Sequence, residues 1–122
     1  MVTSIQVFEE VLKDLKKIGS IEASAVVSRD GLLMLSDMPS GSTSAETFAA
    51  MAATMLGAAE TATTELRKGI PDRVIVESEH GKLVAIGAGP KALLVVMTVP
   101  DAGLGLILVE LEKAAEKIKK VI

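Results

Sequence analysis

Apolar side chains recur every three or four residues near both ends of the chain, which is the spacing of an amphipathic helix. Thr3 and Gln6 have the form of a capping box before the first of these segments, and Gly19 is a stop signal after it. The pattern therefore predicts a helix at each end of the chain. Its apolar positions are Ile5, Phe8, Leu12, Leu15 and Ile18 in the first segment, and Leu104, Ile107, Leu108, Leu111, Ala115, Ile118 and Ile122 in the last.

Short β-rich runs, bounded by Gly, Pro and Asp, predict a first pair of strands and a later group of three. Asp30 and Gly31 form a turn signal within the first pair, and His80-Gly81 is a tight turn within the second group. The last run, ALLVVMTV, has no polar face, so we expect it in the middle of a sheet, covered on both sides. The strands are expected at 21–28, 32–37, 73–79, 82–88 and 92–99.

Residues 43–68 predict one long helix that has two different faces. Thr43 and Glu46 offer a capping box at its start. One face carries most of the bulk and is expected to lie on the core. Its residues are Phe48, Met51, Met55, Ala59, Ala62 and Leu66. The opposite face is nearly free of side-chain bulk and consists of Glu46, Ala50, Ala53, Gly57, Glu60 and Thr64.

The small residues in the middle of this second face predict a close contact between helices. Small side chains at helical spacing allow another backbone to approach. The alternative is a merely Ala-rich helix, because Ala has the highest helix propensity. Gly57 argues against that alternative, since a Gly inside a helix costs about 1 kcal/mol relative to Ala. We therefore expect the small face to pair with a second copy of the chain.

Placing the fully apolar last strand at the centre predicts one five-stranded antiparallel sheet. Numbered along the chain, its strands take the order 2-1-5-4-3, which leaves strands 2 and 3 at the edges. Strand 3 is β-rich at its centre, and an edge of this kind needs protection. Pairing with a second copy beside the small-faced helix would provide it. The predicted homodimer interface consists of Glu46, Ala50, Ala53, Gly57, Glu60, Val74, Ile75 and Val76.

Composition narrows the class of protein. A chain of 122 residues with 49% hydrophobic and 24% charged residues fits one globular domain over residues 1–122. With no Cys, the chain has no disulfide and no thiolate metal site, which suits a cytoplasmic protein. A net charge of −3 and only 2% aromatic residues argue against nucleic acid as a partner. No apolar run approaches the roughly 18 residues that membrane insertion requires.

The sequence offers no set of residues for catalysis, and no cofactor or metal ligand set. His80 is the one histidine and falls in a turn, and Asp30 beside Gly31 is typical of turn geometry. Three arginines, Arg29, Arg67 and Arg73, fall at the ends of elements. An arginine donated to a GTPase could stabilise charge on the transferred phosphoryl group, although solvated element ends explain each of them more simply. Arg67 and Arg73 are retained as candidate partner contacts.

Five stretches of the sequence resemble the Roadblock family, which includes dynein light chains and prokaryotic regulators of Ras-like GTPases. The resemblance rests on small and apolar patterns over nearly the whole chain. It implies a profilin-like α+β fold, with the long helix on one face of the sheet and the two terminal helices on the other. It also implies homodimers joined through the second helix and the third strand. The stretches that carry it are VSRDG at 27–31, LGAAE at 56–60, VIVES at 74–78, LLVVMTV at 93–99 and GLG at 103–105.

These features favour a non-enzymatic interaction module that forms homodimers and binds a small Ras-like GTPase. One alternative is an adaptor for a motor or its cargo, of the light-chain kind. Another is a small-molecule sensor with an apolar pocket between sheet and helix. That pocket would be lined by Met34, Met51, Met55 and Met97.

Overall fold

The computed structural model describes residues 2–39 and 44–122 and has the predicted order of helices and strands. Element ends differ from the predicted ones by at most three residues where both are described. The elements are α1 (Ser4–Lys16), β1 (Ile21–Ser28), β2 (Leu33–Asp37), α2 (Ala45–Glu65), β3 (Arg73–Ser78), β4 (Gly81–Gly87), β5 (Ala92–Thr98) and α3 (Leu104–Lys119).

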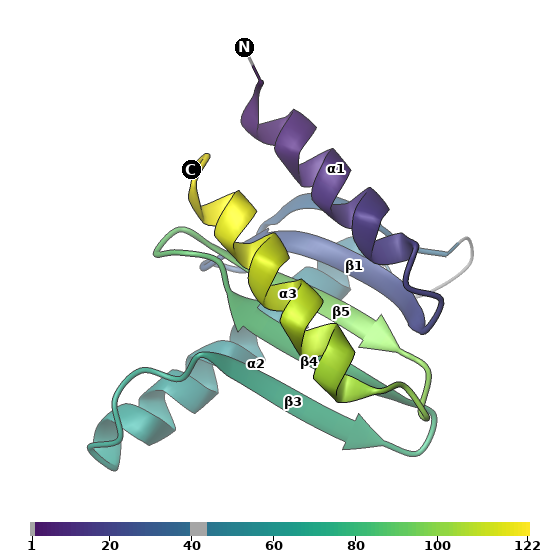
Figure 1. The fold of residues 1–122 in the computed structure, drawn as a ribbon. Coiled ribbons are helices and arrows are strands. Elements are labelled where there is room, and N and C mark those ends of the chain that lie inside the picture. Colours follow the sequence, from purple (N-terminus) through teal and green to yellow (C-terminus); the bar gives the residue numbers. More distant parts are fainter. Residues whose placement is uncertain (1, 40–43) are drawn as a thin grey trace.

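The strands form one antiparallel sheet in the order β2-β1-β5-β4-β3, which confirms the predicted order. The sheet is the middle layer of three: α1 and α3 lie side by side on one face, and α2 lies on the other (Figure 1). Strand β3 is therefore an edge strand next to α2.

Side chains of β5 alternate between two hydrophobic clusters, one on each face of the sheet. Leu94 and Val96 pack with α1 and α3, and Leu93 and Val95 pack with α2. All four are buried, as the absence of a polar face predicted. The two-sided burial explains why this strand is the centre of the sheet.

Local signals set the helix starts. Thr3 and Gln6 form the predicted capping box, in which each residue's side chain accepts a hydrogen bond from the backbone N–H of the other. Ser44 caps α2 by accepting a hydrogen bond from the backbone N–H of Thr47 at 3.1 Å. The predicted cap at Thr43 lies outside the described residues. Gly103 precedes α3, where no side chain makes a cap hydrogen bond.

Phe48 was correctly predicted as core, but the rest of the predicted core face of α2 was wrong, because the helix is rotated relative to the expected orientation. The buried residues are Phe48, Ala49, Ala52 and Leu56, whereas Met51 is 59% exposed and Leu66 is 70% exposed. Two alanines at the contact let the helix approach the sheet closely, and the bulkier Met51 then points outward. Ala residues on every side of α2 left its sequence without a clear apolar stripe.

Candidate functional site

The outward side of α2 is an exposed surface of mostly small side chains, and we call it the small face. Gly57 lies at its centre, and a Cβ placed there would meet no described atom within 4 Å outside the adjoining backbone of α2 and the two neighbouring residues. Nothing within the protomer requires glycine at this position. The small face consists of Ala50, Met51, Thr54, Gly57, Ala58 and Thr61.

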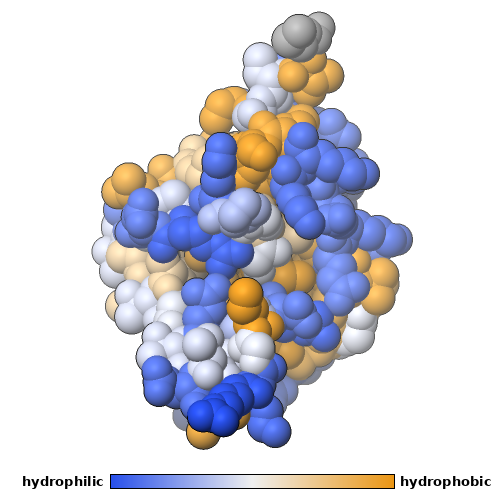
Figure 2. Space-filling model, turned by 90° about the vertical axis from the view of Figure 1, so that its left-hand side faces the viewer, coloured by the Kyte–Doolittle hydropathy of each residue, from blue (hydrophilic) through white to orange (hydrophobic). Residues whose placement is uncertain are grey.

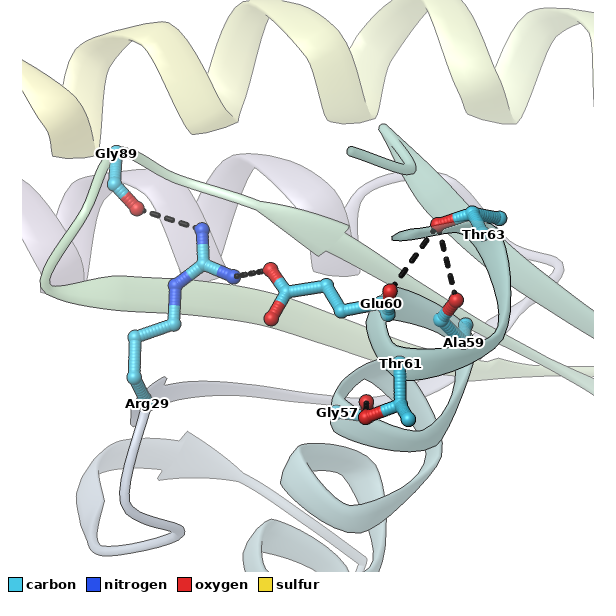
Figure 3. Close-up of polar contacts among 7 residues, drawn as sticks. All are labelled: Arg29, Gly57, Ala59, Glu60, Thr61, Thr63 and Gly89. Carbon is cyan, nitrogen blue, oxygen red and sulfur yellow. Dashed lines mark hydrogen bonds and ion pairs between the residues drawn. The ribbon is translucent and has the colours of Figure 1, made fainter. Parts of the chain in front are cut away.

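Two threonines of the small face hide their hydroxyl groups within the helix. Thr54 Oγ1 donates to the carbonyl oxygen of Ala50 at 2.8 Å. Thr61 Oγ1 donates to that of Gly57 at 3.2 Å (Figure 3). Both hydroxyl donors are thus satisfied before any partner arrives. Covering this face would leave neither hydroxyl donor unpaired, which is the condition for burying polar groups cheaply.

Three of the predicted interface residues contact other parts of the same protomer. Ala53 and Val74 are half-buried and pack against the cluster beneath α2, and the Glu60 side chain contacts Arg29. Gly31, at φ 88°, explains part of this packing: a Cβ there would lie 3.5 Å from Ala53 Cβ. Some small residues of α2 therefore accommodate the β1–β2 turn of the same chain.

The remaining predicted interface residues are accessible. Glu46, Ala50 and Gly57 are exposed on α2. On the edge strand β3, Ile75 is 37% exposed and Val76 is 38% exposed. Their cross-strand partners Val84 and Leu83 pack on opposite faces of the sheet, so Ile75 and Val76 also point to opposite faces.

The second half of α2, residues 57–65, has little support from its own protomer, and we call it the projecting half. Each of its residues is exposed or half-buried, and the last buried residue of the helix is Leu56. In Figure 1 the end of α2 lies beyond the start of β3. At the bottom of Figure 2, where α2 ends, strongly hydrophilic atoms adjoin a pale area and separate hydrophobic spots.

The connection from α2 to β3 begins with a Schellman motif that has an arginine in the position usually taken by glycine. Arg67 has φ 58°, and among residues 2–39 and 44–122 no other non-glycine residue has a positive φ. The N–H of Lys68 donates to the carbonyl of Thr63 at 2.7 Å, and the N–H of Arg67 donates to that of Thr64 at 3.0 Å. The connection exposes two large apolar side chains, Leu66 (70%) and Ile70 (80%).

The two arginines predicted as partner contacts differ in their surroundings. Arg67 is exposed. Arg73 is partly engaged, because its Nη1 donates to Glu112 Oε1 of α3 at 2.9 Å. This pair lies in an open hollow of about 400 Å³ between α3 and strands β3 and β4.

Arg29 occupies a site that was not predicted from the sequence. Its side chain was expected to be solvated at the end of a strand. Its guanidinium reaches α2 and the β4–β5 turn, and its side chain is 31% exposed (Figure 3). The signal in the sequence was the pair Gly87 and Gly89, because a Cβ at Gly87 would lie 2.9 Å from Arg29 Nη2. The spacing of that pair indicates a turn, and it does not identify an arginine neighbour.

The proposed apolar pocket of methionines was wrong. Met34 packs against the cluster on the α1 and α3 side, whereas Met97 packs against the cluster on the α2 side. The sheet separates them, and Met51 points outward. These side chains cannot line one cavity.

The groups considered for chemistry lie apart from one another. His80 is in the β3–β4 turn with its side chain 91% exposed, and its nearest carboxylate, Glu79, is 4.0 Å away. Within residues 2–39 and 44–122, no three His, Asp or Glu residues are grouped as a metal site would require. Over the same ranges, none of the helices is both long enough and apolar enough to cross a membrane.

Two comparisons with solved structures bear on the fold. The gliding protein MglB of Thermus thermophilus superposes with a TM-score of 0.85 at 19% identity, over 99% of this chain and 92% of that one. Profilin IA of Acanthamoeba castellanii superposes with a TM-score of 0.66 at 13% identity, over 93% of this chain and 96% of that one. The expectation of a profilin-like, Roadblock fold is confirmed.

Sequence comparison places the chain in a family. The uncharacterized protein MJ1340 of Methanocaldococcus jannaschii is 42% identical over 111 residues, which span 91% of this chain and 96% of that protein. The sequence pattern of the Roadblock/LC7 domain matches residues 7–98, from α1 to the end of β5. The stretches at 27–31, 56–60 and 74–78 and nearly all of 93–99 fall inside this match, whereas 103–105 lies beyond it, and the chain belongs to the Roadblock/LC7 domain family.

Proposed function

We propose that this protein is a non-enzymatic homodimer in the cytoplasm that binds and regulates a small Ras-like GTPase. The observation that carries the proposal is the small face of α2, which is exposed along the helix and is made of Ala, Gly, Thr and one Met. Met51 is the one long side chain of this face, and the short Ala, Gly and Thr side chains that make up the rest lose little side-chain entropy when they are covered. Such a face suits the close approach of a second helix.

The projecting half of α2 supports the same proposal. An isolated helix as short as residues 57–65 is marginal in water, and helices in proteins gain most of their stability from packing. Residues 57–65 receive little packing within the protomer. A second copy of α2 would supply the missing contacts.

Strand β3 would extend the interface beyond the helix. It is an edge strand of the sheet and follows α2 in the chain, and its centre exposes Ile75 and Val76. Pairing with β3 of a second copy would satisfy the edge and cover both side chains in part. An interface that joins a helix and a strand fixes the relative orientation of the two copies.

The GTPase partner is inferred from the family, and the α2–β3 connection is our candidate contact. Leu66 and Ile70 offer exposed apolar area, and Arg67 adds a charge between them. Exposed apolar area beside an arginine is typical of surfaces that bind other proteins. Arg73 is a weaker candidate, because its guanidinium already pairs with Glu112.

Regulation by such a dimer would act through the shape of the GTPase. A partner that binds one arrangement of the switch loops better than the other shifts the GTPase towards it. This route needs no catalytic group from the dimer.

The test uses purified protein and a purified Ras-like GTPase from the same organism, loaded with GDP or a non-hydrolysable GTP analogue. We expect a complex containing two copies of this protein, with different affinities for the two nucleotide states. Leu66→Ser together with Ile70→Ser should weaken that complex and leave the homodimer intact. Homodimers that bind the GTPase in neither state would contradict GTPase regulation and favour an adaptor of the light-chain kind.

A further inference from the structure

Arg29 joins three segments that are far apart in the sequence. Its Nη2 donates to the carbonyl oxygen of Gly89 at 2.6 Å, and its Nη1 lies 3.4 Å from Glu60 Oε1 (Figure 3). Its backbone N–H also donates to the carbonyl of Lys91 at 3.3 Å. The β1–β2 turn, α2 and the β4–β5 turn therefore meet at one side chain.

The surroundings of Arg29 are shaped for its guanidinium. Gly87 leaves the space that Nη2 occupies, since a Cβ there would lie only 2.9 Å away. Arg29 Nε is buried and has no acceptor among the described residues. A buried donor without an acceptor opposes folding, so the contacts of the two Nη atoms must account for this placement.

Glu60 is in the projecting half of α2, where support from other elements is scarce. Its ion pair with Arg29 links this half to the β1–β2 turn, and residues 57–65 form no other ion pair with the described part of the chain. The Glu60 side chain is 42% exposed, and the Arg29 side chain is held on its far side by the Gly89 carbonyl. The pair can thus transmit the position of the β4–β5 turn to the helix.

We infer that Arg29 is a positioning residue that fixes the projecting half of α2 relative to the sheet. The guanidinium forms a bridge between the β4–β5 turn and Glu60, in the helix that has no buried anchor beyond Leu56. An effect of Arg29 on dimer affinity rests on the proposed function, because that effect requires two copies to pair through α2. The effect of Arg29 on the position of the helix does not depend on the proposed function.

The test is amide hydrogen exchange in Arg29→Gln and Glu60→Gln, at a dilution at which sedimentation shows monomers for every variant. Losing this partly exposed ion pair should speed exchange of the amides of residues 61–66 by about twofold to fivefold in Arg29→Gln. Amides of β5 and α3 should keep their wild-type rates. Glu60→Gln should produce a smaller change in the same residues.

Arg73→Gln is the matched control, because it removes another arginine–glutamate pair, at 2.9 Å, on the α3 side of the sheet. It should leave exchange in α2 unchanged. The inference is overturned if residues 61–66 exchange at wild-type rates in both test variants, or if exchange rises equally in every element. Faster exchange in residues 61–66 with an unchanged dimer affinity would support the role of Arg29 and contradict pairing through α2.

Discussion

Small residues of α2 either pack within the protomer or leave an open surface, and the sequence alone does not distinguish the two cases. Ala53 packs beside the β1–β2 turn, where a Cβ built on Gly31 would lie 3.5 Å from the Cβ of Ala53. Gly57 is also small, yet outside the adjoining part of α2 no described atom lies within 4 Å of the position its Cβ would take. The first residue serves the protomer, and the second is free for a partner.

Arg67 provides a prediction about stability. Its left-handed backbone conformation costs an L-residue about 1–2 kcal/mol, whereas glycine adopts it freely. Allowing for the greater freedom of glycine in the unfolded chain, Arg67→Gly should raise the free energy of unfolding by roughly 0.5–1 kcal/mol. Urea denaturation measures the change.

Lys68→Gly is the control for Arg67→Gly. Lys68 does not share the positive φ of its neighbour, so glycine there should lower the free energy of unfolding by about 0.4–1 kcal/mol. A lower stability for Arg67→Gly as well would show that its side chain contributes more than the backbone strain removes.

Signals that act over a few residues were predictable, and those that depend on distant contacts were not. The capping box of Thr3 and the positive φ of Gly31 follow from side chains and turn chemistry within four residues. The site of Arg29 depends on Gly89, which is 60 residues away in the chain. No spacing rule connects those positions.

At the scale of elements, the rotation of α2 decides which side chains bear on stability. Leu56 is 2% exposed, so Leu56→Ala should lower the free energy of unfolding by about 2–5 kcal/mol. Met51 was predicted as core but is 59% exposed, and Met51→Ala should cost less than about 0.5 kcal/mol in the monomer. Thermal or urea unfolding of both variants at low concentration compares the two orientations, and a larger loss for Met51→Ala would contradict the observed one.

Strand β3 provides a second prediction at this scale. Val76→Lys places a charge at the centre of the exposed edge, where two copies would bring like charges together. The dissociation constant of the homodimer should rise by at least about tenfold, equal to about 1.4 kcal/mol. Ser36→Lys, on the opposite edge strand β2, should leave that constant unchanged. Equal dimer affinity for Val76→Lys and the wild type would remove β3 from the interface.

Element types and the order of strands were predictable because one strand, β5, is apolar on both faces and must be central. The rotation of α2 was not, because its alanines give the helix no single apolar stripe. The prediction assumed that bulk faces the core. In the structure small residues face both the sheet and the outside.

At the scale of the whole molecule, the features proposed for pairing lie on two adjacent elements. α2 presents the small face and its projecting half, and β3 follows it as an edge of the sheet. The terminal helices α1 and α3 cover the other face of the sheet. A second copy that covers α2 and β3 would complete the molecule without disturbing either hydrophobic cluster.

Sedimentation equilibrium of the wild type, Gly57→Val and Gly105→Val tests the central claim most directly. Gly105 is also an exposed helical glycine with open space around it, but it lies in α3. We expect wild type and Gly105→Val to dimerise with a dissociation constant of about 10 μM or below. Gly57→Val should raise that constant at least tenfold, because overpacking costs about 1–3 kcal/mol and is felt once in each of the two copies. A monomeric wild type, or a Gly57→Val dimer of undiminished affinity, would contradict pairing through the small face of α2.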